Sequence, residues 1–190
     1  MDLDVNLKAS LTNIMDAKST HHSHSPFATK PVQVGPVLIG GPHFTVIAGP
    51  CSIESHSQFL ETAIAVKKAG ASLLRGGIWK LRTSAKTFQG LGPEAFSMIA
   101  DVLKDTNMKL VSEVTDPRQI ELVDDYIEMY QVGSRNMHNY ALLKELGQTR
   151  KPVLIKRGFA AFIDEWIKAA EYVTLGGNEN VILCERGIRT

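Results

Sequence analysis

The chain has 190 residues, of which 44% are hydrophobic and 22% are charged, and its formal net charge is +1. This composition is typical of a globular protein with one substantial core, and the near-neutral charge argues against nucleic acid as a partner. No apolar run approaches the roughly 18 residues that a membrane-spanning helix needs, so we expect no membrane partner.

The N-terminus and the cysteines indicate the compartment. The first residues, MDLDVNLKASLTN, lack the basic start and apolar core of a secretory signal. Cys51 and Cys184 lie far apart and form no C-x-x-C pair, so they do not indicate a disulfide framework. We therefore expect a cytoplasmic protein, and we expect Cys184, in the middle of an apolar run, to be buried.

The N-terminal part of the chain differs in pattern from the rest. Residues 1–30 are predicted to form a flexible arm. Residues 31–45 include VQVGPVLIGGPHF, which alternates and is broken by Gly-Pro and Gly-Gly, and this pattern predicts a small hairpin. The remaining residues, 46–190, are predicted to form a single domain.

Short apolar runs alternate with helical patterns throughout this domain. The runs are FTVIAG, ASLL, MKLVSEV, MYQVG, KPVLIK and NVILCE. Helix boundaries between them are predicted at Ser55 or Ser57 to Lys68, from Pro93, at Asp116–Pro117 before RQIELVDDY, at 139–147 and at 163–175. Six strands that alternate with five helices predict a parallel sheet, because parallel neighbours need such crossovers.

A polar or reactive residue stands at or just after the end of each apolar run, and these residues are Cys51, Arg75, Glu113, Arg135, Lys156 and Arg186. Parallel strands place all six ends on one face, which in a (β/α)₈ barrel holds the active site. Unrelated surface charges would explain one or two of these positions well but all six poorly. We therefore expect the six residues to meet at one mouth of the sheet.

The stretch at residues 74–92, LRGGIWKLRTSAKTFQGLG, concentrates the cations Arg75, Lys80, Arg82 and Lys86. It is either a solvated surface loop or a cradle for a strongly anionic group. Arginine offers a planar fork to phosphate and carboxylate groups, whereas lysine is a mobile point charge. Because cations recur at other strand ends, the anion cradle is the better interpretation.

Several of these motifs resemble the type I 3-deoxy-D-arabino-heptulosonate 7-phosphate (DAHP) synthases. The resemblance rests on GPCSIES, LRGGIWKLRTS, FQGLG, SEVTDP, GSRNMHNYALLKELG, KPVLIKRG and ILCERGIRT, in the family's order and spacing from about residue 32 onward. It implies a TIM (β/α)₈ barrel of the class I aldolase type. In the second-strand loop Leu81 replaces the family's usual proline, whereas Lys80, Arg82 and Thr83 match.

The resemblance also implies an activity and a site. The family condenses phosphoenolpyruvate with erythrose 4-phosphate and releases phosphate, as the first step of the shikimate pathway. Family positions assign phosphoenolpyruvate to Arg75, Lys80, Arg135, Lys156 and Arg186, and the sugar phosphate to Arg82 and Thr83. Lys80 would also assist proton transfer. Glu113 would either orient water or serve only as a counter-ion for the arginines.

A divalent metal (manganese, iron or zinc) is the cofactor that the resemblance implies. Cys51 matches its cysteine ligand, although the same residue would also serve as a small buried hydrophobe. The other ligands would come from seventh and eighth strands, and only about six βα units are predicted here. We therefore expect an incomplete metal site and an inactive fragment of a synthase that is a homo-oligomer when full length. The alternatives are a 3-deoxy-D-manno-octulosonate 8-phosphate synthase and a non-catalytic remnant.

Overall fold

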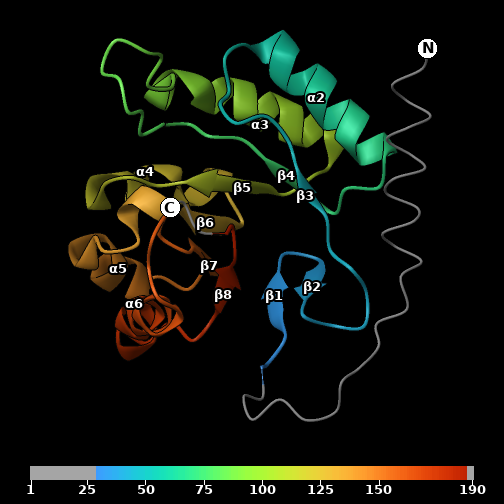
Figure 1. The fold of residues 1–190 in the computed structure, drawn as a ribbon. Helices are drawn as coiled ribbons and strands as arrows, with labels where there is room; N and C mark the ends of the chain where they lie inside the picture. The colour runs from blue at the N-terminus through green and yellow to red at the C-terminus, as the bar shows by residue number, and fades with distance from the viewer. Residues whose placement is uncertain (1–28, 188–190) are drawn as a thin grey trace.

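The structure, a computed structural model, describes residues 29–187. The arm expected at residues 1–30 therefore lies almost entirely outside the described residues. Within them a six-stranded parallel sheet follows the chain in the order β3-β4-β5-β6-β7-β8. The sheet curves, and helices cover its outer side (Figure 1). This arrangement confirms the prediction of a partial TIM barrel with about six of eight units.

All six predicted strands of the sheet are present. They are β3 (Ile47–Ala48), β4 (Leu73–Arg75), β5 (Leu110–Glu113), β6 (Met129–Val132), β7 (Val153–Lys156) and β8 (Val181–Cys184). Each strand pairs in parallel with the next, as in the register that places Val111 opposite Met129. No helix among the described residues is long and apolar enough to cross a membrane.

Alternation along the strands divides the sheet into an outer and an inner face. Outward residues such as Leu74, Tyr130 and Ile155 pack in the larger core with the helices. Inward residues near the strand starts form a second apolar cluster that includes Leu73 and Val111. Successive side chains of a strand point to opposite faces, so the next inward residue on each strand lies one layer closer to the carboxyl end.

An antiparallel hairpin covers the apolar inner cluster. It consists of β1 (Val32–Val34) and β2 (Val37–Ile39), and Gly35 in its turn has a φ of +52°. Val32 and Val34 are buried and join the cluster of Leu73 and Val111. The hairpin therefore covers the inner face of the sheet near the starts of the strands, at the end opposite their carboxyl ends. Its place beside the sheet can be followed in Figure 1.

Side-chain caps begin two of the helices at residues that the sequence predicts. Ser55 Oγ accepts the Gln58 N–H at 3.2 Å at the start of α2 (His56–Lys68). Asn139 Oδ1 accepts the Leu142 N–H at 3.2 Å before α5 (Tyr140–Gly147). Pro93 lies in a 3₁₀ turn, Gly92–Glu94, that leads into α3 (Ala95–Thr106), and α6 spans Ile163–Leu175. Such caps satisfy N–H groups that the first helical turn leaves unpaired.

The sequence predicts one continuous helix after Asp116, and this prediction is wrong. The segment forms a 3₁₀ turn (Pro117–Gln119), a single α turn α4 (Ile120–Val123) and a second 3₁₀ turn (Asp124–Tyr126). Two side chains from elsewhere in the chain hold polar groups of this segment. Tyr130 Oη donates to Asp124 Oδ1 at 2.5 Å, with the Ile120 carbonyl oxygen 3.4 Å away, and Lys151 Nζ donates to the Asp124 carbonyl. Such insertions interrupt the regular hydrogen-bond ladder of a helix.

Candidate functional site

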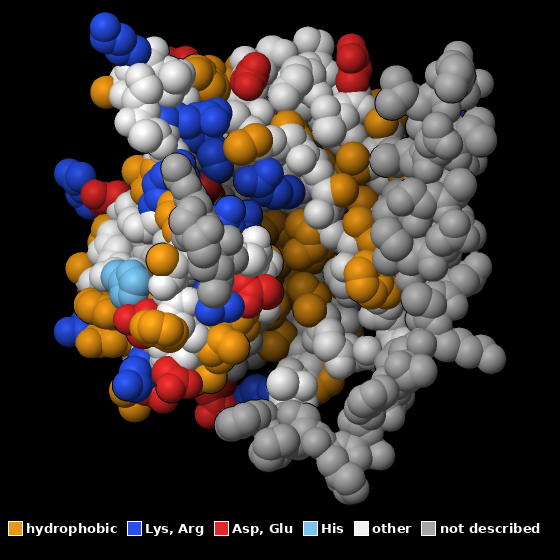
Figure 2. Space-filling model, viewed as in Figure 1, with side chains coloured by type: hydrophobic (Ala, Val, Ile, Leu, Met, Phe, Trp, Pro, Cys, Tyr) orange, Lys and Arg blue, Asp and Glu red, His pale blue; other side chains and the backbone are white. Residues whose placement is uncertain are grey.

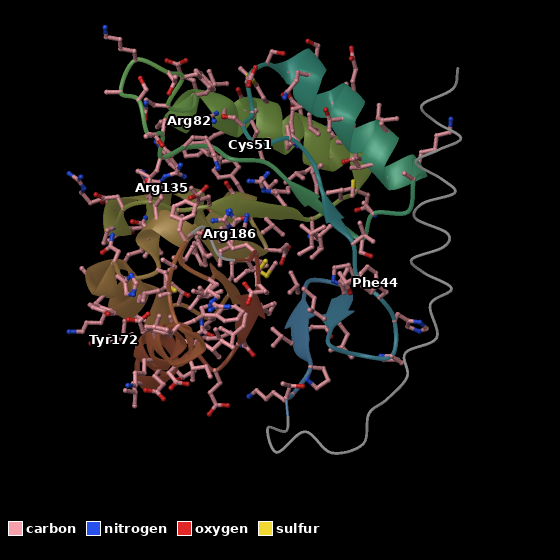
Figure 3. The ribbon with its side chains drawn as sticks, in the orientation of Figure 1. Phe44, Cys51, Arg82, Arg135, Tyr172 and Arg186 are labelled. Atoms are coloured by element: carbon pink, nitrogen blue, oxygen red, sulfur yellow. The ribbon has the colours of Figure 1, made fainter. Side chains whose placement is uncertain are left out.

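A cavity of about 360 Å³ lies at the carboxyl ends of the strands and contains most of the predicted residues. Its lining includes Arg75, Lys80, Glu113, Gln131, Arg135, Lys156, Phe159, Cys184, Glu185 and Arg186. Figure 2 shows Lys and Arg side chains gathered on the visible face of the molecule. In Figure 3, Arg135 and Arg186 lie in one part of the view, together with Arg82 and Cys51 and away from Phe44 and Tyr172.

The alternation of the strands explains the floor of this cavity. The inner-face residues of the apolar cluster are followed, two positions later, by side chains with polar atoms. Leu73 precedes Arg75 in this way, and Leu154 precedes Lys156. The remaining inner-face members of the upper layer are Glu113, Gln131 and Cys184. One periodic pattern therefore builds an apolar base and a charged upper layer.

Lys80 and Glu113 form a buried ion pair inside the cavity. Lys80 Nζ lies 2.5 Å from Glu113 Oε2, and the two side chains are 8% and 9% exposed. The Lys80 backbone is fixed because its N–H donates to the Gln89 carbonyl at 2.8 Å. Gly90 makes this loop possible: its φ is +98°, and a Cβ there would lie 2.2 Å from the Ile78 carbonyl oxygen. The loop is thus built to point Lys80 inward.

Gly133 leaves the space that the Glu113 carboxylate occupies. A Cβ at Gly133 would lie only 2.1 Å from Glu113 Oε1. Strand pairing sets Glu113 opposite Gln131 on β6, two residues before this glycine. Any side chain at position 133 would therefore displace the carboxylate and disturb its pair with Lys80.

The two residues predicted for the sugar phosphate lie at the rim rather than in the lining. Thr83 Oγ1 accepts a hydrogen bond from Arg135 Nη2 at 3.3 Å. Arg82 is exposed, and its Nε donates to the Phe88 carbonyl at 3.2 Å. The structure thus joins Thr83 to the cavity through Arg135, whereas Arg82 lines no part of it.

Burial and the clustered cations change the acid–base behaviour of Lys156. Burial and the neighbouring Arg75 guanidinium both lower the pKa of the Lys156 ammonium group. Desolvation and like charge each disfavour a cation. An anion in the cavity would relieve this repulsion, which makes the site more favourable for anionic ligands than for neutral ones.

Cys51 lies beside the cavity, exposed and close to three cations. Burial opposes ionisation of its thiol, but Lys80, Arg75 and Arg82 outweigh that effect, so the pKa of Cys51 is lowered. A thiolate is the form that binds metal. However, the described residues contain no group of three or more His, Cys, Asp and Glu side chains able to hold a metal ion. These residues therefore do not by themselves fit the implied metal.

The sequence interpretation missed several residues of the cavity. Gln131 is 4% exposed and lies on the inner face two positions after Met129, so strict strand alternation could have found it. Phe159 carries no such signal. The expectation that Cys184 is buried is wrong, because it is half-buried and lines the cavity at the end of β8.

A second ion pair orders the segment that carries Arg186. Arg157 is buried, and its Nη1 donates to Glu185 Oε2 at 2.8 Å. Glu185 Oε1 accepts the backbone N–H groups of Arg186 and Gly187 at 2.8 and 2.9 Å. The Arg157 guanidinium and these N–H groups lower the pKa of Glu185 to about 2. Glu185 thus fixes the backbone from which the Arg186 side chain extends.

Comparison with known proteins identifies relatives of the chain. The model of the DAHP synthetase I family matches residues 14–190. The phospho-2-dehydro-3-deoxyheptonate aldolase of Thermotoga maritima is 42% identical over 159 residues, which cover 84% of this chain and 47% of that protein. A 2-dehydro-3-deoxyphosphooctonate aldolase of Koribacter versatilis is 30% identical over 165 residues, with 83% and 59% covered.

Solved structures agree with these matches. The crystal structure of the Thermotoga maritima DAHP synthase aligns with a TM-score of 0.79 at 40% identity and covers 85% of this chain and 47% of its own. A truncated form of that synthase aligns with a TM-score of 0.75 at 38% identity, with 85% and 58% covered. The chain therefore spans about half the length of the curated relative it matches at 42% identity. The family model and these relatives together show that the chain belongs to the DAHP synthetase I family.

Proposed function

We propose that the protein is a 3-deoxy-7-phosphoheptulonate synthase, which condenses phosphoenolpyruvate with erythrose 4-phosphate and releases phosphate. The observation that supports this most is the charge of the cavity. Five cationic side chains line it, Arg75, Lys80, Arg135, Lys156 and Arg186, against the two carboxylates Glu113 and Glu185. Both carboxylates are already engaged in ion pairs. The remaining positive charge suits a small ligand that carries both a phosphate and a carboxylate.

Each cavity residue has a role in this proposal. Arg75, Arg135, Lys156 and Arg186 hold the phosphate and carboxylate of phosphoenolpyruvate, because guanidinium and ammonium groups form charge-assisted hydrogen bonds to both. Thr83, hydrogen-bonded to Arg135, and Arg82 at the rim receive the phosphate of the sugar.

Lys80 and Glu113 are assigned to proton transfer. Their contact of 2.5 Å would allow a proton to pass between an ammonium and a carboxylate that both face the cavity. Glu113 would also orient the water that attacks phosphoenolpyruvate before phosphate leaves. The other role considered for Glu113, a counter-ion for the cations, agrees with the same contact. One side chain can therefore fill both roles.

The family uses a divalent metal, and we propose Cys51 as one ligand of manganese, iron or zinc. We also propose that the protein is a cytoplasmic homo-oligomer. Its free cysteines suit a reducing compartment, and exposed apolar side chains such as Phe162, Leu175 and Leu183 suit burial against another subunit.

Binding of phosphoenolpyruvate to the purified chain tests the site. By calorimetry we expect binding that Arg135→Ala weakens roughly tenfold to more than a hundredfold, because a charge-assisted contact contributes about 1.5–3 kcal/mol. Arg150→Ala is the matched control, since Arg150 is exposed and lies outside this cavity. Equal losses of affinity in the two variants, or no loss in either, would contradict the placement of Arg135 in the binding site.

Turnover tests the reaction and its sugar substrate. On the protein purified from its natural source, phosphate release from phosphoenolpyruvate is measured with erythrose 4-phosphate and with arabinose 5-phosphate. If the protein turns over, the proposal requires a clear preference for the four-carbon sugar. Preference for arabinose 5-phosphate would favour the octulosonate alternative, and no turnover with either sugar would favour the non-catalytic one.

A further inference from the structure

Phe159 is an aromatic side chain in the lining of a cavity otherwise dominated by charge. It follows β7 by three residues, is half-buried and lines the cavity with Arg135 and Arg186. Its backbone is held from the preceding residue, where the Gly158 N–H contacts Met137 Sδ at 3.0 Å. The ring is therefore presented from a fixed backbone.

Arg135 and Arg186 both lie against this one ring. The guanidinium carbon of Arg186 is 4.5 Å from the ring centroid, and that of Arg135 is 5.3 Å from it. Both distances fall within the roughly 6 Å at which a cation is attracted by the negative face of an aromatic ring. The two arginines come from different strand ends, and Figure 3 shows them in the same part of the molecule.

The two arginines need such a support because they are exposed and long. Neither forms an ion pair shorter than 4.0 Å among the described residues. Like charges in one cavity repel each other, and a free arginine side chain loses rotamer freedom when a ligand orders it. An aromatic ring attracts a guanidinium without neutralising its charge, whereas a carboxylate in the same place would compete with the anionic ligand.

We propose that Phe159 is a positioning residue that holds Arg135 and Arg186 ready for the anionic ligand. It contributes no charge and takes no part in bond changes. Its effect is to set the side chains before the ligand arrives, so that less conformational freedom is lost on binding. The inference rests on the proposed function only for the choice of phosphoenolpyruvate as a probe.

Binding measurements on the purified chain test this role, with phosphoenolpyruvate and inorganic phosphate as probes. Phe159→Leu keeps an apolar side chain but removes the ring, and we expect it to weaken binding of both anions about tenfold. Phe159→Trp keeps a ring face and is expected to bind within about twofold of the wild type. Phe162→Leu is the matched control, because Phe162 is 74% exposed and lies outside the cavity.

A double-mutant cycle separates positioning from simple packing. In the Arg186→Gln background, Phe159→Leu should weaken anion binding much less than it does in the wild type, because one of the two stacked cations is already gone. An equal loss of affinity in both backgrounds would overturn the proposal. So would a Phe159→Trp variant that binds the anions as weakly as Phe159→Leu does. Circular dichroism confirms that each variant is folded before it is titrated.

The outcomes also separate this inference from the proposed function. Binding of phosphoenolpyruvate that is indifferent to the ring contradicts the role of Phe159 and leaves the synthase proposal in place. Ring-dependent binding of phosphate without binding of phosphoenolpyruvate supports the role of Phe159 and contradicts the synthase proposal. If the folded chain binds neither anion, both are wrong.

Discussion

Removing the carboxylate of Glu113 would leave Lys80 as an unpaired buried cation. In Glu113→Gln the side chain keeps its size but loses the charge that lies 2.5 Å from Lys80 Nζ. Removal of one partner of a buried ion pair costs about 3–5 kcal/mol. Because the cavity admits water, we expect the lower end, about 3 kcal/mol, which for a chain of this length is a fall of about 6–12 °C in the melting temperature.

Urea unfolding of the wild type and of Glu113→Gln measures this loss of stability. The matched control is Glu128→Gln, since Glu128 pairs with Lys109 at 2.8 Å but the two side chains are 30% and 42% exposed. An exposed pair contributes only about 0–1 kcal/mol. Equal, small losses in both variants would contradict the claim that the buried pair is an essential part of the cavity.

Phosphate gives the same experiment a second readout. An anion that binds the folded state alone raises the free energy of unfolding according to its concentration relative to the dissociation constant. In Glu113→Gln, Lys80 is released from its partner, so the variant should bind phosphate more tightly and be stabilised more by it than the wild type is. A variant that phosphate stabilises less than the wild type would show that Glu113 does not compete with ligand anions.

Three further predictions follow from the same geometry. Gly133→Ala should displace Glu113 and destabilise the protein by about as much as Glu113→Gln, and a combined variant should add little; full additivity by urea unfolding would contradict this. The affinity for sulfate, measured by calorimetry, should fall as pH rises through the lowered pKa of Lys156, because the ammonium group loses its charge. Lys156→Arg should abolish that fall, and identical pH profiles for the variant and the wild type would refute this prediction. The pKa of Glu185 is lowered from 4.5 to about 2, so its contribution to stability is present above 4.5 and is lost as pH falls through about 2; a carboxyl NMR titration with a midpoint near 4.5 would exclude the pairing with Arg157.

The strands and most helix boundaries could be predicted because their signals are local. Ser55 and Asn139 cap helices through their own neighbours, and Gly176 follows the last residue of α6. The broken helix at α4 could not be predicted, because Tyr130 and Lys151 reach it from other parts of the chain. Local pattern therefore gives the elements, whereas interruptions depend on tertiary contacts.

The candidate site was predictable to the extent that it follows the sheet. Arg75 and Lys156 stand at strand ends on the inner face, where a parallel topology brings them together. Gln131 follows from the same alternation, although only the structure made that plain. Phe159 could not be recognised, because its importance depends on the distances from its ring to two guanidinium groups. Burial and contact geometry are properties that spacing alone does not carry.

The most direct test of the central claim is a crystal structure of the chain with phosphoenolpyruvate bound. The account predicts the ligand in the cavity at the carboxyl ends of the strands, with its phosphate and carboxylate oxygens within hydrogen-bond distance of Arg135, Lys156 and Arg186 and with Lys80 nearby. Phosphoenolpyruvate bound elsewhere on the chain, with this cavity holding only water at saturating ligand, would contradict it.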